Sequence, residues 1–310
     1  RKLKGIYLKS CVDMIAPKAL VSFIDNSTYL HFLCKHSKTY KVIGIQNGSR
    51  NAHNTDFGSF HLDYYFCFGK HERDLFKSHG ARIKTFIPCG SLVADLNRRK
   101  NYNEKKNIDI LVISGWRGNT DKTNYNGSRE TMKTMEKMDK LISRLVSEKK
   151  YSLAVALRMP KDSDEDFMQN WGYEKDYFRS IYGEDVELLD FYFDQNSRRR
   201  DIYKYIDKSR LSVSVLSTAI FEAYGLGEKA LLCNFTGERK IYNWKPLLVT
   251  ETEEYHQFSE LVDEILNDEG YFEKHKNYSR YLMEFPPNQS VRNFISDNIT
   301  KIMKKIIITD

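Results

Sequence analysis

The fold is decided by one stretch of the sequence, Leu211-Ser-Val-Ser-Val-Leu-Ser217-Thr218-Ala-Ile-Phe-Glu222-Ala-Tyr-Gly225-Leu-Gly227-Glu-Lys-Ala-Leu-Leu-Cys233-Asn234. An apolar run leads into a hydroxyl pair, an amphipathic run, a glycine and a second apolar run. The two apolar runs are typical of strands that are buried on both faces, and the hydroxyl pair is typical of a helix start. Two strands joined through a helix lie parallel, so the stretch predicts an α/β fold.

The same alternation extends over most of the chain. The sequence predicts buried strands at Ala19–Ile24, Lys41–Ile45, Tyr64–Phe68, Ile83–Ile87, Ile108–Ile113, Leu153–Leu157, Val186–Phe193, Leu211–Leu216 and Ala230–Cys233. It predicts helices at Ser27–Lys35, Lys70–His79, Arg129–Glu148, Tyr173–Ile181, Arg198–Lys208 and Ala219–Leu226. Alternating strands and helices indicate parallel sheets with helices on both faces.

The chain divides at a polar segment. Its 310 residues suggest two domains, and residues 97–107 have the composition of a linker. We therefore expect a first Rossmann-like domain over 1–100 and a second over 108–285. A Pro-Pro break at Pro286 precedes apolar residues at helical spacing, which predicts a C-terminal helix over 288–310. The first domain is short, and the chain opens without Met, so we expect an excised or trimmed polypeptide.

Composition narrows the classes of partner. The net charge is 49 − 42 = +7, which suits anionic partners, but the 42 acidic residues interrupt any basic stripe and disfavour nucleic acid. The five cysteines are scattered without a C-x-x-C pair or zinc-ligand spacing, which favours a reduced, intracellular protein. No apolar run is long enough to predict a transmembrane helix.

The hydroxyl pair is the first candidate binding site. Ser217 and Thr218 stand where a helix begins, so their hydroxyls and the free backbone N–H groups there can hold a phosphate. Glu222, one turn further along, can accept a hydrogen bond from a ribose or sugar hydroxyl. An ordinary helix N-cap followed by a surface glutamate explains the same residues equally well.

These residues resemble a known family. A strand followed by S-T-x-x-x-E-A-x-x-x-G and a further strand is similar to the donor-binding half of GT-B glycosyltransferases. The order of Gln46-Asn47-Gly48, Gly69 and Gly90-Ser91-Leu92 is similar to bacterial surface-carbohydrate transferases. These include capsule and lipopolysaccharide enzymes that use CMP-activated Kdo. The resemblance implies two Rossmann-like domains with parallel sheets facing a cleft, no metal or other cofactor, and a cytoplasmic enzyme at the inner face of the membrane.

Further donor contacts are expected after two other strands of the second domain. Gly115, Trp116 and Arg117 follow the strand Ile108–Ile113, where glycine lets the backbone approach an anion and Arg117 can balance a leaving phosphate. Arg158 ends the next strand and can contact a phosphate or carboxylate. The related sialyltransferase pattern has a His-Pro pair after that strand, which this sequence lacks, so the sugar and the nucleotide stay open.

Three residues of the first domain are candidates for catalysis. Sugar transfer needs a carboxylate or histidine as base, and Asp25 follows a predicted strand at a helix start. A helix N-cap explains Asp25 as well. Gln46 and Asn47 end the next strand, where their amides can hydrogen-bond a sugar, although a simple tight turn explains them too.

The loop after Gln46 and Asn47 supplies candidate acceptor contacts. Arg50 can grip a carboxylate or phosphate through two hydrogen bonds, and a surface arginine is the usual alternative. His53 is expected beside it, and His53, Asp56 and His61 are alternative bases. No D-x-D motif follows a strand, so we expect no metal ligands.

The sequence therefore predicts a nucleotide-sugar-dependent, metal-independent glycosyltransferase. It would move a sugar, with CMP-Kdo or a similar acidic sugar as a candidate donor, to a glycan or glycolipid of the cell surface, with peripheral membrane association. A CDP-polyol phosphotransferase of surface polymer synthesis and a non-catalytic glycan- or nucleic-acid-binding module are the alternatives.

Overall fold

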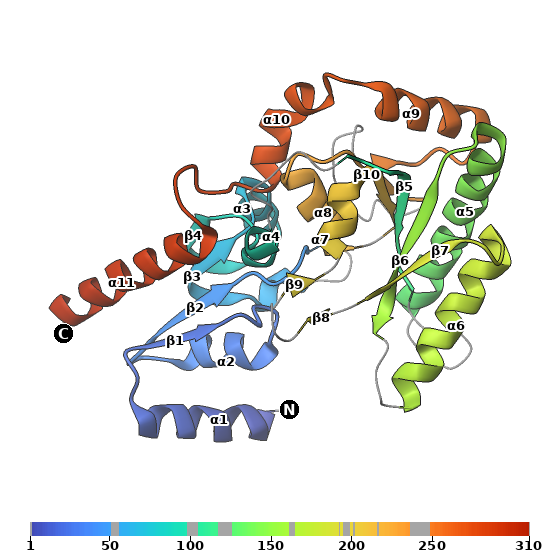
Figure 1. Ribbon diagram of the computed structural model, residues 1–310. Helices are drawn as coiled ribbons and strands as arrows, with labels where there is room; N and C mark the ends of the chain where they lie inside the picture. Colours follow the sequence, from blue (N-terminus) through green and yellow to red (C-terminus); the bar gives the residue numbers. More distant parts are fainter. Residues whose placement is uncertain are drawn as a thin grey trace. The chain divides into compact units, whose positions relative to one another are not determined.

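The chain folds into two compact α/β units (Figure 1). The computed structural model describes residues 2–50, 56–97, 105–116, 126–160, 165–191, 193–194, 199–200, 202–215, 217–235 and 249–309. Unit 1 comprises Arg1–Leu96 and Asn277–Asp310, and unit 2 comprises Asn97–Lys276.

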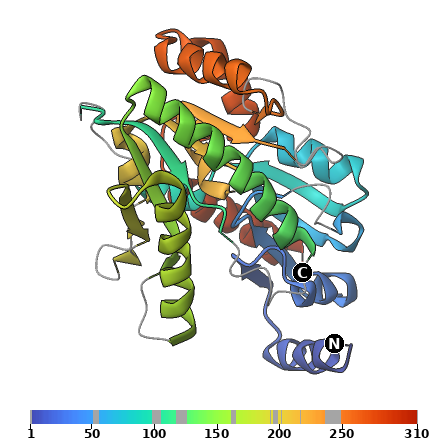
Figure 2. The same cartoon turned by 90° about the vertical axis from the view of Figure 1, so that its right-hand side faces the viewer.

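Unit 1 is built on a four-stranded parallel sheet. Its strands are β1 (Ala19–Ser22), β2 (Lys41–Ile45), β3 (His61–Cys67) and β4 (Arg82–Pro88), in the order β1-β2-β3-β4. Its helices are α1 (Lys2–Ile15), α2 (Thr28–His36), α3 (Lys70–Ser78), α4 (Leu92–Asn97) and α11 (Val291–Thr309), with a 3-10 turn, η1, at Phe57–Ser59. Both views place α1 beside α2 (Figures 1 and 2).

The sheet of unit 1 buries both faces, as its continuously apolar strands predict. On one face Val42 and Tyr65 pack with Leu30 of α2 and Phe76 of α3. The adjacent residues in the strands face the opposite side, because side chains alternate along a strand. There Ile43 and Phe66 pack with Val291, Ile295, Ile302 and Ile306 of α11.

The C-terminal segment belongs to unit 1. The N–H of Glu284 donates to the carbonyl of Phe68 at 2.8 Å, and the Tyr281 hydroxyl donates to Asp74 at 3.0 Å. A Cβ atom at Gly69 would lie 2.4 Å from the carbonyl oxygen of Leu282, so only glycine permits this approach. The sequence placed residues up to 285 in the second domain, whereas the structure ends unit 2 at Lys276. This packing joins residues far apart in the sequence, which no local pattern reveals.

Unit 2 is a larger, doubly wound sheet. Its strands are β5 (Ile108–Ile113), β6 (Leu153–Pro160), β7 (Glu187–Phe191), β10 (Ser209–Ser214), β11 (Ala230–Cys233) and β12 (Val249–Thr250), all parallel in the order β12-β11-β10-β5-β6-β7. Its helices are α5 (Asn126–Lys149), α6 (Glu165–Tyr182), α7 (Ile202–Lys208), α8 (Thr218–Gly225), α9 (Tyr255–Asn267) and the first part of α10 (Tyr271–Leu282). The strand order reverses between β5 and β10, and open parallel sheets bind ligands at such a switch point.

The predicted elements largely match the structure. The strands Lys41–Ile45, Ile108–Ile113 and Ala230–Cys233 have the predicted bounds. The predicted strand Val186–Phe193 is divided into β7 and β8 (Phe193–Asp194). The predicted helix start at Arg198 is wrong, because Arg199–Arg200 form β9, antiparallel to β8, and α7 begins at Ile202.

The described residues contain no helix with the length and apolarity that a membrane crossing requires.

Candidate functional site

The switch point of unit 2 brings together three predicted donor contacts. Gly115 lies two residues after the end of β5, and Thr218 begins α8 after the neighbouring strand β10. A Cβ atom at Gly115 would lie 2.7 Å from Cγ2 of Val215, so glycine lets the two strand ends approach closely. Arg158 lies in β6, on the other side of β5. The three segments therefore end at the same edge of one sheet.

A buried carboxylate from α6 holds two of these segments. The Ser114 hydroxyl and the Arg158 backbone N–H both donate to Oε1 of Glu174, the second at 2.9 Å. The Trp116 N–H donates to Oγ of Ser114 at 3.1 Å, and the Arg158 guanidinium donates to the Trp116 carbonyl. The sequence analysis missed Glu174, because a glutamate on a helix usually lies on its solvated face. Here it fixes the positions of Trp116 and Arg158.

Trp116 offers a polar group to this edge of the sheet. Its indole is buried and lies 5.3 Å from the Tyr177 ring, centroid to centroid. Within the described part of the chain, its Nε1–H forms no hydrogen bond. A buried donor without a partner costs free energy, and a ligand acceptor would remove that cost.

The start of α8 combines a cap with a buried acid. Ser217 is the N-cap, and its Oγ accepts from the Ala219 N–H at 3.2 Å, so the predicted N-cap geometry is present. Glu222 is only 4% exposed, and its Oε2 accepts from the Tyr203 hydroxyl at 2.7 Å. The alternative of a surface glutamate is therefore wrong. Arg117 and His53 lie outside the described residues.

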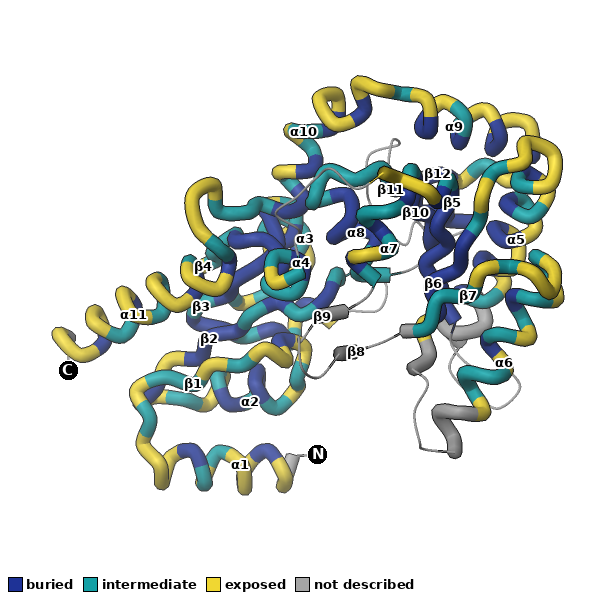
Figure 3. The backbone as a smooth tube through the Cα atoms, viewed as in Figure 1, coloured by how far each residue is buried: buried dark blue, intermediate teal, exposed yellow. Residues whose placement is uncertain are grey.

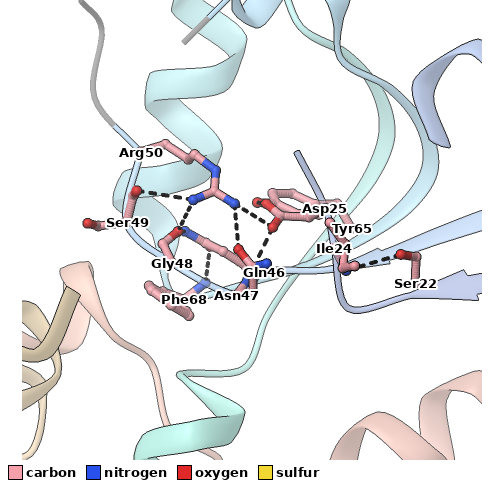
Figure 4. Close-up of polar contacts among 10 residues, drawn as sticks. All are labelled: Ser22, Ile24, Asp25, Gln46, Asn47, Gly48, Ser49, Arg50, Tyr65 and Phe68. Atoms are coloured by element: carbon pink, nitrogen blue, oxygen red, sulfur yellow. Dashed lines mark hydrogen bonds and ion pairs between the residues drawn. The ribbon is translucent and has the colours of Figure 1, made fainter. Parts of the chain in front are cut away.

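Unit 1 contains a second polar cluster, centred on a buried ion pair (Figure 4). Asp25 follows β1 and is completely buried. Its Oδ1 accepts from Nη2 of Arg50 at 2.5 Å and from the Asn47 N–H at 3.2 Å, and its Oδ2 accepts from the Tyr65 hydroxyl at 2.7 Å. Burial raises the pKa of Asp25, and the charge of Arg50 opposes that rise. Both carboxylate oxygens are therefore engaged inside the protein.

The turn after β2 is held by the same arginine. Arg50 donates to Oδ1 of Asn47 at 2.8 Å and to the carbonyls of Gly48 and Ser49 at 2.9 and 3.2 Å. Gln46 donates from Nε2 to the Gly48 carbonyl at 2.9 Å and accepts at Oε1 from the Phe68 N–H at 2.8 Å. The predicted residues Asp25, Gln46, Asn47 and Arg50 thus form one network. Arg50 is part of this network and is not a loose surface side chain.

A second buried carboxylate borders this network. Glu72, in the first turn of α3, is 3% exposed, and burial raises its pKa to about 7. Gln46 and Arg50 oppose that rise. Within the described residues, Oε2 of Glu72 and Nε of Arg50 are both buried without hydrogen-bond partners. The sequence analysis missed Glu72, because Lys70-His-Glu-Arg-Asp reads as a solvated helix start.

The described part of the chain contains no group of three or more His, Cys, Asp and Glu side chains arranged to hold a metal ion.

Most of the chain matches one family of known proteins. The family described as "putative O-antigen biosynthesis protein" matches residues 43–296. A search of curated proteins finds no match.

Three solved structures have a similar fold. A protein titled "putative UDP-N-acetylglucosamine 2-epimerase" from Listeria monocytogenes gives a TM-score of 0.58 at 11% identity, covering 97% of this chain and 78% of that one. MnaA of S. aureus, in a co-structure with UDP, gives 0.56 at 14% identity, covering 98% and 79%. Sucrose-phosphate synthase from Thermosynechococcus elongatus gives 0.56 at 9% identity, covering 99% and 78%. These likenesses confirm the predicted GT-B type of fold with two parallel α/β units.

Proposed function

Because the chain belongs to this O-antigen biosynthesis family, we propose that it is a glycosyltransferase of surface-polysaccharide synthesis. It moves a sugar from a nucleotide-activated donor to a glycan or glycolipid acceptor. The observation that carries the proposal is the switch point of unit 2, where Gly115 and Trp116, Arg158 and the start of α8 share one sheet edge.

The donor binds to unit 2 in this proposal. The N-terminus of α8 attracts the phosphates through its dipole and its backbone N–H groups, with the hydroxyl of Thr218 close by. Arg158 adds a positive charge. Glu174 holds its backbone and the Trp116 carbonyl accepts from its guanidinium, so this charge has a fixed position. Glu222, whose Oε2 already accepts from the Tyr203 hydroxyl, accepts a further hydrogen bond from a ribose or sugar hydroxyl.

The leaving nucleotide is stabilised by fixed charges. As the sugar departs, negative charge grows on the phosphate, and preorganised donors stabilise such charge most effectively in a site that excludes water. Arg158, Arg117 and the α8 dipole supply this stabilisation without a metal ion. Transfer activity measured with EDTA tests this part of the proposal. We expect the activity to survive EDTA; a loss of activity that Mg²⁺ restores contradicts the proposal.

The acceptor binds to unit 1. Arg50 has a buried Nε–H without a partner in the described residues, which can bind an acceptor carboxylate, phosphate or hydroxyl. Asp25 acts as a positioning residue, because its two oxygens orient Arg50, Asn47 and Tyr65. Gln46 and Asn47 hold the turn that presents acceptor contacts, with His53 nearby in the sequence.

We extend the proposal to the donor sugar and to the location of the enzyme. We place the enzyme at the cytoplasmic face of the membrane, where lipid-linked glycans are assembled, with peripheral membrane association. The candidate donors are CMP-Kdo or a similar acidic sugar and UDP-sugars; the structural similarity to UDP-bound MnaA supports including the latter.

Nucleotide binding is the direct test. Isothermal titration with CMP, CDP, UDP and GDP should show binding of one of them, and Arg158→Ala should weaken it at least tenfold, about 1.4 kcal/mol. Arg144→Ala is the matched control, because Arg144 is an exposed arginine paired with Glu148 within α5. Absence of binding by all four nucleotides would remove the proposal.

A transfer assay then separates the candidate reactions. The protein is incubated with nucleotide-sugars and a lipid-linked glycan acceptor, and the mass added to the acceptor is measured. Addition of a sugar mass supports glycosyl transfer, whereas addition of a polyol phosphate identifies the CDP-polyol alternative. Conversion of UDP-N-acetylglucosamine to an epimer without an acceptor would instead identify an epimerase, the activity after which the Listeria protein is named.

A further inference from the structure

Two buried side chains of unit 1 carry polar atoms without a hydrogen-bond partner. Within the described residues, these atoms are Nε of Arg50 and Oε2 of Glu72. The Arg50 side chain is 11% exposed and Glu72 is 3% exposed. Native proteins leave few buried polar groups unpaired, because each one costs free energy, so this pair needs an explanation.

Both residues lie at the ligand edge of unit 1. Gln46 directly follows β2, Arg50 belongs to the same turn, and Glu72 lies in the first turn of α3, which follows β3. β2 and β3 are neighbours in the parallel sheet and are largely buried (Figure 3). Open parallel sheets bind ligands at the carboxyl ends of their strands. The two unpaired atoms are therefore at the edge where a ligand of this unit is expected.

Glu72 is joined directly to the network of Asp25 and Arg50. The Gln46 side chain and the Arg50 backbone N–H hydrogen-bond to its carboxyl group. Gln46 also donates to the Gly48 carbonyl, which accepts from the Arg50 guanidinium as well. The unpaired donor and the unpaired acceptor therefore belong to one cluster, around the turn of residues 46–50 that Figure 4 shows.

The two unpaired atoms have opposite hydrogen-bonding roles. Nε of Arg50 can only donate, and Oε2 of an ionised Glu72 can only accept. A hydroxyl accepts one hydrogen bond and donates another, so it satisfies both atoms at once. An ionised carboxylate only accepts and would leave Glu72 unpaired. A water molecule also fits between the two atoms, and a sugar hydroxyl can replace it.

The charges beside the pair disfavour an anion. Asp25 already balances the charge of Arg50, because its Oδ1 accepts from Nη2 at 2.5 Å. When Glu72 is ionised, two carboxylates share one guanidinium. A ligand carboxylate would add a third negative charge to a buried site, where like charges repel each other strongly. An uncharged sugar adds no charge.

We propose that Glu72 and Arg50 bind one hydroxyl of an uncharged sugar of the acceptor, and that Glu72 discriminates against acceptor sugars that carry a carboxylate. That this sugar is the acceptor rests on the proposed function, whereas the choice of a hydroxyl rests on the two unpaired atoms and the charges beside them. A site built to hydrogen-bond a hydroxyl rejects ligands that leave its buried polar groups unpaired.

Protonation of Glu72 removes the discrimination. Burial raises the pKa of Glu72 to about 7. The other charged and titratable groups whose charges interact with it are Asp25, Arg50, Tyr65 and Cys67. Burial raises the pKa of Tyr65 and of Cys67 well above the ordinary values, so both stay neutral. At pH 8 Glu72 is mostly ionised and repels an anion, whereas at pH 5 it is protonated and can donate a hydrogen bond to one.

Matched pairs of sugars test the proposal. The probes are the methyl glycosides of glucose, galactose and mannose and those of the corresponding uronic acids, whose carboxylates stay ionised at pH 5 and at pH 8. A carboxylate on a hexose lies within about 7 Å of any hydroxyl of the same ring, where repulsion at an effective dielectric constant of about 20 weakens binding more than tenfold.

Dissociation constants are measured by NMR titration, without a nucleotide. At pH 8 we expect at least one neutral glycoside to bind, at least about tenfold more tightly than the matching uronate. At pH 5 the difference should fall below about threefold, because Glu72 is then protonated.

A charge-removing variant assigns the preference to Glu72. Glu72→Gln keeps the size of the side chain, and its neutral and acidic sugars should bind within about threefold of each other at both pH values. Asp74→Asn is the matched control, because it removes a half-exposed carboxylate from the same helix and should keep the wild-type preference. The wild-type pH series needs no variant, so it tests the proposal even if Glu72→Gln fails to fold.

Three results overturn the proposal. In the first, no neutral glycoside binds at pH 8; in the second, a uronate binds there at least as tightly as its neutral counterpart. In the third, Glu72→Gln keeps the wild-type preference, as expected if the pair holds only a structural water. The proposed function fails separately, through absence of nucleotide binding, because sugar binding is measured without a nucleotide.

Discussion

The buried ion pair between Asp25 and Arg50 gives the most informative test of the network in unit 1. Asp25→Asn keeps the size of the side chain but removes its charge and replaces one acceptor oxygen by an NH₂ donor. The variant leaves the guanidinium of Arg50, which is 11% exposed, without its carboxylate partner. It also disturbs the hydrogen bonds from the Asn47 N–H and the Tyr65 hydroxyl.

The magnitude follows from these contacts. Removal of one member of a buried ion pair costs about 3–5 kcal/mol. Arg50 keeps its bonds to Asn47, Gly48 and Ser49, so we expect a loss of about 3 kcal/mol in the free energy of unfolding of unit 1. Tyr65→Phe removes one hydrogen bond to a charged group and should cost about 1.5 kcal/mol.

The assay must report on unit 1 alone. All three tryptophans lie in residues 97–276, so tryptophan fluorescence follows unit 2. Hydrogen exchange of the β2 and β3 amides, measured in increasing urea, gives the stability of unit 1. All variants should be compared at the same pH, because burial raises the pKa of Asp25.

A double-variant cycle decides whether the ion pair is the cause. Asp25→Asn combined with Arg50→Gln should cost less than the sum of the single changes, by about 1–3 kcal/mol. Strictly additive costs, or a loss below about 0.5 kcal/mol for Asp25→Asn, would refute the reasoning.

Three further predictions concern single residues. Burial raises the pKa of Glu72 from 4.5 to about 7, so the folded protein retains a proton that the unfolded chain releases between those values. The stability of unit 1 should therefore fall by about 3 kcal/mol as the pH rises from 4.5 through 7, and Glu72→Gln should abolish that part of the fall in urea titrations at pH 5 and 8; an unchanged pH dependence contradicts this. Gly69→Ala should cost about 2–3 kcal/mol, because its Cβ would meet two backbone carbonyls, whereas Gly172→Ala, where nothing lies within 4 Å, should stabilise α6 by about 0.5–1 kcal/mol; equal melting temperatures for the two variants would show that the close approach is absent. Ser217→Ala should lower stability by about 1 kcal/mol through loss of the N-cap and should raise KM for the donor more than it lowers kcat, and a pure loss of kcat would contradict a role in donor binding.

Those strands and helices could be predicted whose burial is visible in the local sequence pattern. The strand Ile108–Ile113 is a continuous apolar run because both faces of β5 are covered, and its bounds could be read directly. Helices α1, α9 and α10 were not predicted, since short amphipathic segments with several charged residues also occur in loops. The return of residues 277–310 to unit 1 depends on contacts such as Glu284 with Phe68, which are distant in the sequence.

The candidate sites were predictable in position but not in their internal contacts. Residues at strand ends, such as Asp25 and Arg158, could be chosen because parallel strands present their carboxyl ends at one edge. Their partners could not be chosen: Tyr65 lies in the middle of an apolar strand, and Glu174 lies in a charged helix. Only the folded chain shows that these residues orient the candidate side chains.

The return of the C-terminal segment also has a consequence for how the protein is made. The sheet of unit 1 needs α11 to cover Ile43 and Phe66, but unit 2, residues 97–276, is translated in between. At about 5–20 residues per second, these 276 − 96 = 180 residues take roughly 10–40 seconds to synthesise. During that time one face of the nascent sheet is bare, so the ribosome-bound chain should be a chaperone substrate until its last helix emerges.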